Sequence, residues 1–139
     1  MFKNILLGVD GSPHSMQAAN VSGELARSLK ADLRIVVVFE PIPTYLGESL
    51  LQQAILSRME TAEHVLQEAL NVIGKIPGQL ETEMLEGPAA EAILAAVSVH
   101  NNDLIIMGSR GLGKLAGLLL GSQSQKVVQH ASCPVLIVR

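Results

Sequence analysis

The stretch MGSRGLGKLAGLLLGSQSQ, residues 107–125, places five glycines within fourteen positions, directly after the apolar run 104–107. Glycine lets a backbone adopt positive φ and approach a ligand closely, as loops that hold phosphate require. Ser122 and Gln125 have the spacing of a capping box, which predicts a helix N-terminus at Gly121–Ser122. The free N–H groups and the positive end of such a helix attract anions. The stretch therefore predicts a site for a phosphate-bearing ligand, to which Arg110 and Lys114 add positive charge.

Two widespread phosphate motifs do not occur in this loop. Lys114 is followed by Leu115 rather than by Ser or Thr, and the chain contains no G-x-G-x-x-G. The sequence therefore disfavours a P-loop NTPase and a dinucleotide-binding dehydrogenase. From the local sequence alone, a glycine-rich connection that serves only as a tight turn remains an alternative.

Outward from this loop, short apolar runs alternate with segments of helical periodicity, the pattern of a parallel sheet covered by helices. Strands are predicted at residues 5–9, 33–39, 80–85, 104–107 and 134–139. Helices are predicted from Ser12–Pro13, over residues 48–74, from Gly87–Pro88 and from Gly121–Ser122. The first helix is predicted to bury Ala18, Val21, Leu25 and Leu29. The pattern indicates an α/β fold in one domain, residues 1–139.

The composition of the chain disfavours some classes of binding partner and some cellular locations. The 139 residues carry a net charge of −3 and only 2% aromatic residues, so neither a basic face nor a stacking platform for nucleic acid is expected. No apolar run approaches the ~20 residues that span a bilayer, which disfavours membrane insertion. Cys133 is the single cysteine, which rules out an internal disulfide and favours the cytoplasm. The four histidines lack metal-ligand spacing, and no G-x-S-x-G elbow occurs.

The glycine loop resembles a known signature. Gly108-x2-Gly111-x9-Gly121-Ser122 is similar to the G-2x-G-9x-G-[S/T] pattern of the nucleotide-binding branch of the universal stress protein family. Residues 5–12 resemble the opening strand of that family, and residues 133–138 resemble its closing strand. The resemblance implies a Rossmann-like fold of the adenine nucleotide alpha hydrolase type. Its open five-stranded parallel sheet would have the order 3-2-1-4-5, with helices on both faces. It also implies a homodimer and ATP as ligand, with or without Mg²⁺.

The resemblance also implies roles for particular residues. Asp10 and Val38 would contact the adenosine half of the nucleotide, although from the local sequence alone Asp10 could merely cap a turn. Gln123 stands where many family members carry a small apolar residue, so its side chain could crowd or extend the site. The full predicted nucleotide-binding set is Gly8, Asp10, Val38, Met107, Gly108, Arg110, Gly111, Gly121, Ser122, Gln123 and Ser124.

Three functions fit these residues. The first is a stress-response module that holds ATP as a regulatory ligand. The second is a slow ATP hydrolase or phosphotransferase, for which the sequence offers no recognisable catalytic constellation. The third is a dimeric interaction protein that does not use nucleotide, which the intact signature argues against. The apolar strand 134–139 would lie uncovered at a sheet edge, so we expect a homodimer joined through it.

Overall fold

The structure is a computed structural model that describes residues 1–111 and 120–139. Its sheet is parallel throughout and has the strand order β3-β2-β1-β4-β5. The strands are β1 (Asn4–Val9), β2 (Asp32–Phe39), β3 (Leu80–Glu86), β4 (Leu104–Gly108) and β5 (Val135–Val138). The α-helices are α1 (Pro13–Leu29), α2 (Glu48–Ile73), α3 (Ala89–His100) and α4 (Ser122–His130), and a short 3₁₀ helix, η1 (Thr44–Leu46), precedes α2. The predicted fold class and strand order are confirmed.

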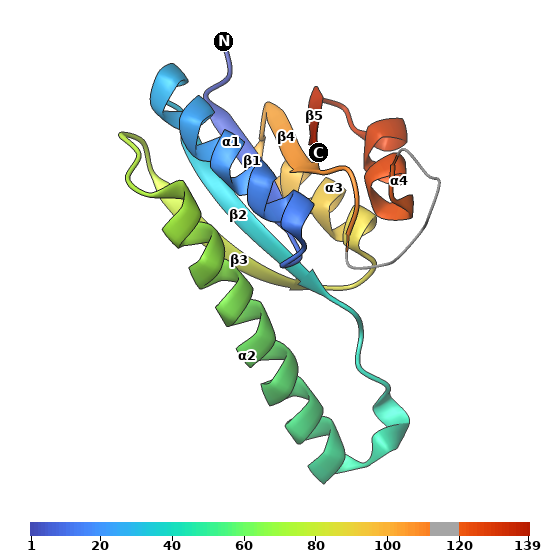
Figure 1. The fold of residues 1–139 in the computed structure, drawn as a ribbon. Helices are drawn as coiled ribbons and strands as arrows, with labels where there is room; N and C mark the ends of the chain where they lie inside the picture. Colours follow the sequence, from blue (N-terminus) through green and yellow to red (C-terminus); the bar gives the residue numbers. More distant parts are fainter. Residues whose placement is uncertain (112–119) are drawn as a thin grey trace.

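The helices form two layers around the sheet, α1 and α2 on one face and α3 and α4 on the other (Figure 1). Side chains of the buried strands alternate between these layers, as the pleat requires. Ile5 and Leu7 of β1 pack with α1 and α2, whereas Leu6 between them packs with α3 and α4. Each face of the central strands is therefore covered, which explains their continuous apolar runs.

The first helix begins where the sequence predicts, but its buried face is centred on smaller residues than predicted. Ser12 caps it by accepting a hydrogen bond from the Ser15 amide at 3.2 Å, with Pro13 in the first turn. Of the four residues predicted to be buried, Ala18 is buried, and Leu25 and Leu29 are half-buried and pack against the same core, whereas Val21 is half-buried outside it. The predicted face is therefore confirmed only in part. The buried line consists of small residues, Ser15, Ala18, Ala19, Ser22, Gly23 and Ala26. Small side chains let α1 lie close to the sheet and α2, since a Cβ on Gly23 would meet the Ile73 carbonyl at 2.9 Å.

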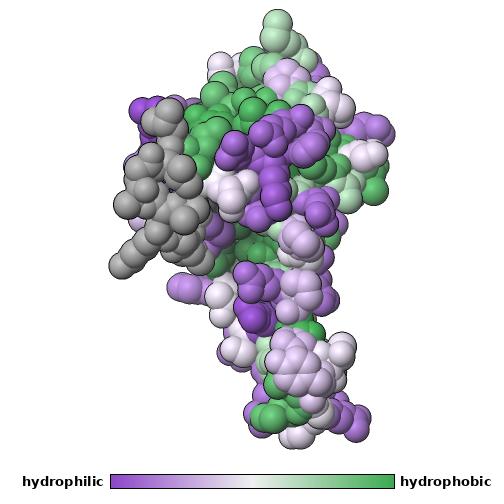
Figure 2. All heavy atoms as spheres, turned by 90° about the vertical axis from the view of Figure 1, so that its right-hand side faces the viewer, coloured by the Kyte–Doolittle hydropathy of each residue, from purple (hydrophilic) through white to green (hydrophobic). Residues whose placement is uncertain are grey.

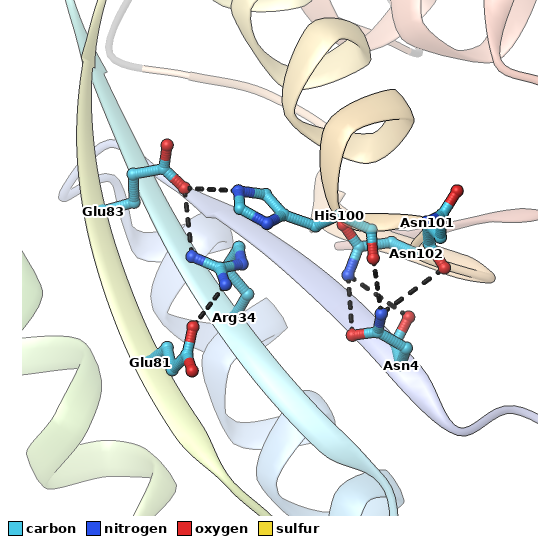
Figure 3. A network of polar contacts seen from close by, with 7 residues as sticks. All are labelled: Asn4, Arg34, Glu81, Glu83, His100, Asn101 and Asn102. Atoms are coloured by element: carbon cyan, nitrogen blue, oxygen red, sulfur yellow. Dashed lines mark hydrogen bonds and ion pairs between the residues drawn. The ribbon is translucent and has the colours of Figure 1, made fainter.

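A polar network holds together the strands at one end of the sheet (Figure 3). Arg34 of β2 pairs with Glu81 and Glu83 of β3, and His100 at the end of α3 lies 3.2 Å from Glu83. The alternating charges of β3 therefore face a cation of the neighbouring strand. In the same network, the Asn4 side chain donates to the His100 carbonyl at 2.8 Å and so ties β1 to α3.

Helix α2 is longer than the sheet it covers. Its 26 residues extend about 39 Å, whereas the eight residues of β2 extend about 26 Å. The excess lies at its first half, which projects beyond the carboxyl ends of the strands (Figure 1). Among the helices in residues 1–111 and 120–139, none is both long enough and apolar enough to cross a membrane.

Candidate functional site

A cavity of about 310 Å³ lies at the carboxyl ends of β1, β2 and β4. In open α/β sheets this is where ligands bind, at the point where the strand order reverses direction. Here β1 continues to β2 on one side and pairs with β4 on the other, which places the reversal between β1 and β4. All eleven residues predicted from the sequence line the cavity: Gly8, Asp10, Val38, Met107, Gly108, Arg110, Gly111, Gly121, Ser122, Gln123 and Ser124.

Two glycines of the signature lie very close to other atoms of the protein. A Cβ on Gly108 would lie 2.8 Å from the His14 carbonyl carbon and 2.9 Å from the Ser15 amide nitrogen. A Cβ on Gly111 would lie 2.6 Å from the Asp10 carboxylate. Packing requires glycine at Gly108, because the backbone of α1 cannot move aside, and this glycine lets the end of β4 approach α1. At Gly111 a Cβ would instead displace the Asp10 side chain from its present position.

Gly121 differs from these two glycines. A Cβ built on it would meet its nearest neighbours, the Arg110 Cα and the Ser109 carbonyl oxygen, at an ordinary 3.5 Å. Its φ of −65° is accessible to any residue. Among residues 1–111 and 120–139, neither packing nor backbone conformation therefore demands glycine here. Space is left beside the N-terminus of α4, on the wall of the cavity.

The start of α4 corrects the predicted capping box. The N-cap is Gly121, the first helical residue is Ser122, and no side chain in the described part of the chain caps the helix. The reason is a tertiary contact: the Gly121 amide donates to the Ser109 carbonyl, and this sets where the chain enters the helix. The first amides of a helix have no acceptor within it, so those of α4 are available beside the cavity.

Asp10 ends β1 with its carboxylate partly used. Its Oδ1 accepts a hydrogen bond from the Ser12 amide at 2.9 Å, which supports the turn into α1. Thus Asp10 caps the turn and also lines the cavity, and the two interpretations of this residue are compatible. Its position at the end of β1, opposite Gly111, puts one acceptor group at the cavity wall.

Gln123 and Ser124 hold the start of α4 against its neighbours. The Gln123 Oε1 accepts from the Ala90 amide at 2.9 Å and so supplies α3 with the cap that Pro88 cannot give. The Ser124 hydroxyl donates to the Gly108 carbonyl at 2.9 Å, and its side chain is buried. Ser122, in contrast, is exposed at the cavity, which leaves its hydroxyl open to a ligand.

Of the two basic residues predicted to lie near the ligand, the structure describes one. Arg110 is exposed at the cavity, and its carbonyl accepts from the Ser12 hydroxyl at 3.3 Å. Lys114, the second cation of the prediction, lies outside the described residues. Cys133 lies away from the cavity, against the core of α3 and α4. Burial raises the pKa of the Cys133 thiol, and the negative charge of Asp103 raises it further.

Of the described residues that line the cavity, sequence reasoning missed seven: Val9, Ser15, Val36, Glu40, Ala89, Ile93 and Leu120. Glu40 directly follows β2, so the rule that ligands meet strand ends could have identified it. Ala89 and Ile93 lie one turn apart at the start of α3, and no local signal shows that this helix reaches the cavity. Only the packing of α3 against the sheet brings them there.

Comparison with known proteins supports the resemblance of the sequence. The sequence model of the Universal stress protein family matches residues 1–139. A Thermus aquaticus protein, "Universal stress protein in QAH/OAS sulfhydrylase 3'region", is 49% identical over 139 residues, which covers 100% of both chains.

Solved structures share the fold. The universal stress protein UspA from Lactobacillus plantarum has a TM-score of 0.88 at 24% identity, covering 99% of this chain and 98% of that one. A universal stress protein in complex with cAMP has a TM-score of 0.72 at 23% identity, covering 99% and 97%. The universal stress protein from Archaeoglobus fulgidus in complex with dAMP has a TM-score of 0.66 at 18% identity, covering 100% and 98%. Since the family match and a relative of nearly half identity both span all 139 residues, the chain belongs to the universal stress protein family.

Proposed function

We propose that this protein binds ATP in the cavity between β1 and β4 and holds it as a regulatory ligand in a homodimer. The observation that carries the proposal is the space at Gly121 beside the uncapped N-terminus of α4. A glycine that packing does not require, next to free amides, is suited to the close approach of a phosphate. The chemistry of the donors, backbone N–H groups and the Ser122 hydroxyl, fits an anionic ligand.

The end of the cavity away from α4 suits a nucleoside. Val36, Val38, Ile93 and Met107 give it apolar walls, and Asp10 places a carboxylate among them. A flat base gains from apolar contact on its faces, and a carboxylate accepts hydrogen bonds from a ribose or an amino group. The cavity volume of about 310 Å³ lies at the lower end of the range for small-molecule sites. In this arrangement the base lies toward β2 and α3, and the phosphates lie toward α4.

Adenine is the base that the family suggests. Two structural neighbours are complexes of universal stress proteins with cAMP and with dAMP. Both ligands share the adenine ring and a single phosphate. We propose a triphosphate rather than these monophosphates for two reasons. The signature Gly108-x2-Gly111-x9-Gly121-Ser122 is intact, and the start of α4 is open toward the cavity.

The proposed dimer joins two copies through β5. This strand pairs only with β4 among the described residues, so its outer edge is unpaired. Val135, Leu136, Ile137 and Val138 are all apolar, and Leu136 is 36% exposed. Antiparallel pairing with the same strand of a second copy would satisfy the edge and cover these side chains.

The decisive experiment measures the ligand directly. Mass spectrometry of nucleotide released from the purified protein, followed by calorimetric titration with ATP, AMP, cAMP and GTP, should identify ATP. A ligand at about 100 times its Kd should stabilise the fold by about 2.7 kcal/mol. Equal affinity for ATP and AMP would show that the outer phosphates are not bound, and no binding of any adenine nucleotide would reject the proposal.

The same preparation tests the enzymatic alternative. Release of phosphate from ATP is measured in the presence of Mg²⁺ over hours. We expect turnover far below the ~10 s⁻¹ typical of enzymes. Turnover above ~1 s⁻¹ would replace the regulatory interpretation with a catalytic one.

A further inference from the structure

The side chain of Gln123 joins two helices at the cavity. Its Oε1 accepts a hydrogen bond from the Ala90 amide at 2.9 Å, across 33 residues of sequence. Gln123 is the second residue of α4, and Ala90 is the second residue of α3. The two helices pack on the same face of the sheet (Figure 1), and the first turn of each borders the cavity. The side chain therefore ties the first turn of one helix to the first turn of the other.

The start of α3 depends on this contact. Pro88, the N-cap of α3, makes no side-chain cap. The backbone bonds of the helix begin with the Ala92 amide, which donates to the Pro88 carbonyl at 3.0 Å, so the Ala90 amide has no acceptor within the helix. Ala90 is only 1% exposed, so without Gln123 its amide would be left with little access to water. The acceptor that holds the first turn of α3 is thus supplied by α4.

The same turn of α3 forms a wall at the nucleoside end of the cavity. Ala89 and Ile93 line the cavity one turn apart. Ile93 reaches across to β1, since a Cβ on Gly8 would lie 3.1 Å from the Ile93 Cδ1. Gln123, in contrast, belongs to the helix whose start is proposed for the phosphates. Its hydrogen bond therefore connects the phosphate end of the cavity to the wall of the base end.

We propose that Gln123 is a positioning residue for the nucleoside, which acts on the base end of the cavity through α3. The inference rests on the proposed function, because that function assigns the base to the end lined by Ile93. Without the acceptor, the first turn of α3 would open part of the time, and Ala89 and Ile93 would leave the wall. Ligand would bind only the molecules in which this turn is formed, so the apparent Kd would rise by the inverse of their fraction.

The amide of Gln123 makes this role specific to the side chain that this sequence carries. Only the oxygen of an amide accepts a hydrogen bond from an N–H, so Oε1 is the end that faces Ala90. A small apolar residue at this position, as in many family members, has no acceptor for that amide. The side chain that could have crowded the site therefore serves to hold a wall of it.

Calorimetric titration with adenosine and with ATP, well below the thermal midpoint, tests the proposal. Gln123→Met keeps the length of the side chain and removes the acceptor. Gln125→Met makes the same change two residues later, at an exposed position that does not line the cavity. Both changes lie in α4, on the side of the molecule that faces the viewer in Figure 2, where much of the surface is hydrophilic.

The two ligands should respond alike, although adenosine has no phosphate. Gln123→Met should raise the Kd of adenosine and of ATP by the same factor, about fivefold, which corresponds to the loss of one helix cap. Gln125→Met should leave both Kd values unchanged. A general loss of stability does not produce this pattern, because the protein remains folded at the temperature of the titration.

The other outcomes overturn the proposal. A loss confined to ATP would show that Gln123 contacts phosphate, and unchanged Kd values would show that its hydrogen bond only stabilises the fold. A wild type that binds ATP but not adenosine would show that the wall formed by α3 adds no measurable affinity. A wild type that binds neither ligand would reject the proposed function itself, so the two failures are distinguishable.

Rescue by a second acceptor completes the test. Gln123→Glu keeps an oxygen for the Ala90 amide and adds a negative charge beside the phosphates. It should bind adenosine within about twofold of the wild type, and ATP about fivefold more weakly. Without ligand, hydrogen exchange at the Ala90 amide should be about fivefold faster in Gln123→Met than in the wild type or in Gln123→Glu. Equal exchange in all three, or loss of adenosine binding in Gln123→Glu, would show that this hydrogen bond does not hold the wall.

Discussion

Two glycines of one signature should respond oppositely to alanine. Gly108→Ala places a Cβ within 2.9 Å of the backbone at His14 and Ser15, so β4 and α1 must separate. Overpacking of this kind costs about 1–3 kcal/mol. Gly121→Ala places a Cβ at 3.5 Å from its neighbours at an accessible φ. Its small cost as an N-cap, about 0.5–1 kcal/mol, is offset by a similar loss of freedom in the unfolded chain.

For ATP affinity the order of the two variants should be reversed, with the larger loss in Gly121→Ala. The methyl group of Gly121→Ala occupies the space proposed for phosphate, and loss of a hydrogen bond to a charged group costs about 1.5–3 kcal/mol. The Kd for ATP should therefore rise about 10- to 150-fold. The Cβ of Gly108→Ala points toward α1 rather than into the cavity, so this variant should bind with nearly unchanged affinity at low temperature.

The assay combines thermal unfolding without ligand and calorimetric titration with ATP. Gly108→Ala should lower the midpoint by about 5–15 °C, and Gly121→Ala should move it by no more than about 3 °C. If Gly121→Ala binds ATP as tightly as the wild type, the phosphates do not lie at the start of α4. If Gly108→Ala unfolds at the wild-type temperature, the close approach of α1 to β4 is not what requires glycine.

Three further results are expected. Gln123→Ala, without nucleotide, should lower the free energy of unfolding by about 1 kcal/mol in urea because α3 loses its cap at Ala90, and Gln123→Glu should retain most of it. Ile137→Asp should halve the mass that sedimentation gives at 10 µM if β5 joins the dimer, and an unchanged mass would exclude that edge. The raised pKa of Cys133 means that the unfolded thiol ionises first as pH rises, so the free energy of unfolding should fall in the alkaline range. Cys133→Ser should remove this part of the fall, and Asp103→Asn, by removing a nearby negative charge, should speed alkylation of the thiol.

Sequence patterns that involve only a few neighbouring residues were sufficient to predict where the strands and helices lie. The apolar runs located all five strands to within one or two residues, and Ser12–Pro13 located the start of α1. These predictions succeed because burial on both faces demands a continuous apolar strand, and because a cap acts within one turn. The order of the strands came from the resemblance, since pairing joins segments that are distant in the chain.

The tertiary structure decided the features that depend on distant residues. Ser122 has the sequence of an N-cap, but the Gly121 amide bonds to Ser109 and moves the cap by one residue. The large residues Val21 and Leu25 have helical spacing, but α1 lies so close to the sheet that only small side chains fit beneath it. Gln123 reaches α3, thirty-three residues away, and the sequence could not show its partner.

The sequence by itself determined that the chain forms a covered parallel sheet, with a glycine loop suited to phosphate after β4. It also identified eleven residues that the structure gathers around one cavity. Only the tertiary structure decided which glycine has free space and where the core ends along α2. The apolar line from Leu51 to Ile73 has the same periodicity throughout, yet its first half lies beyond the sheet, where Leu51 is half-buried and Ile55 and Met59 are exposed. Periodicity records which side of a helix is apolar, whereas burial depends on whether another element lies opposite that side.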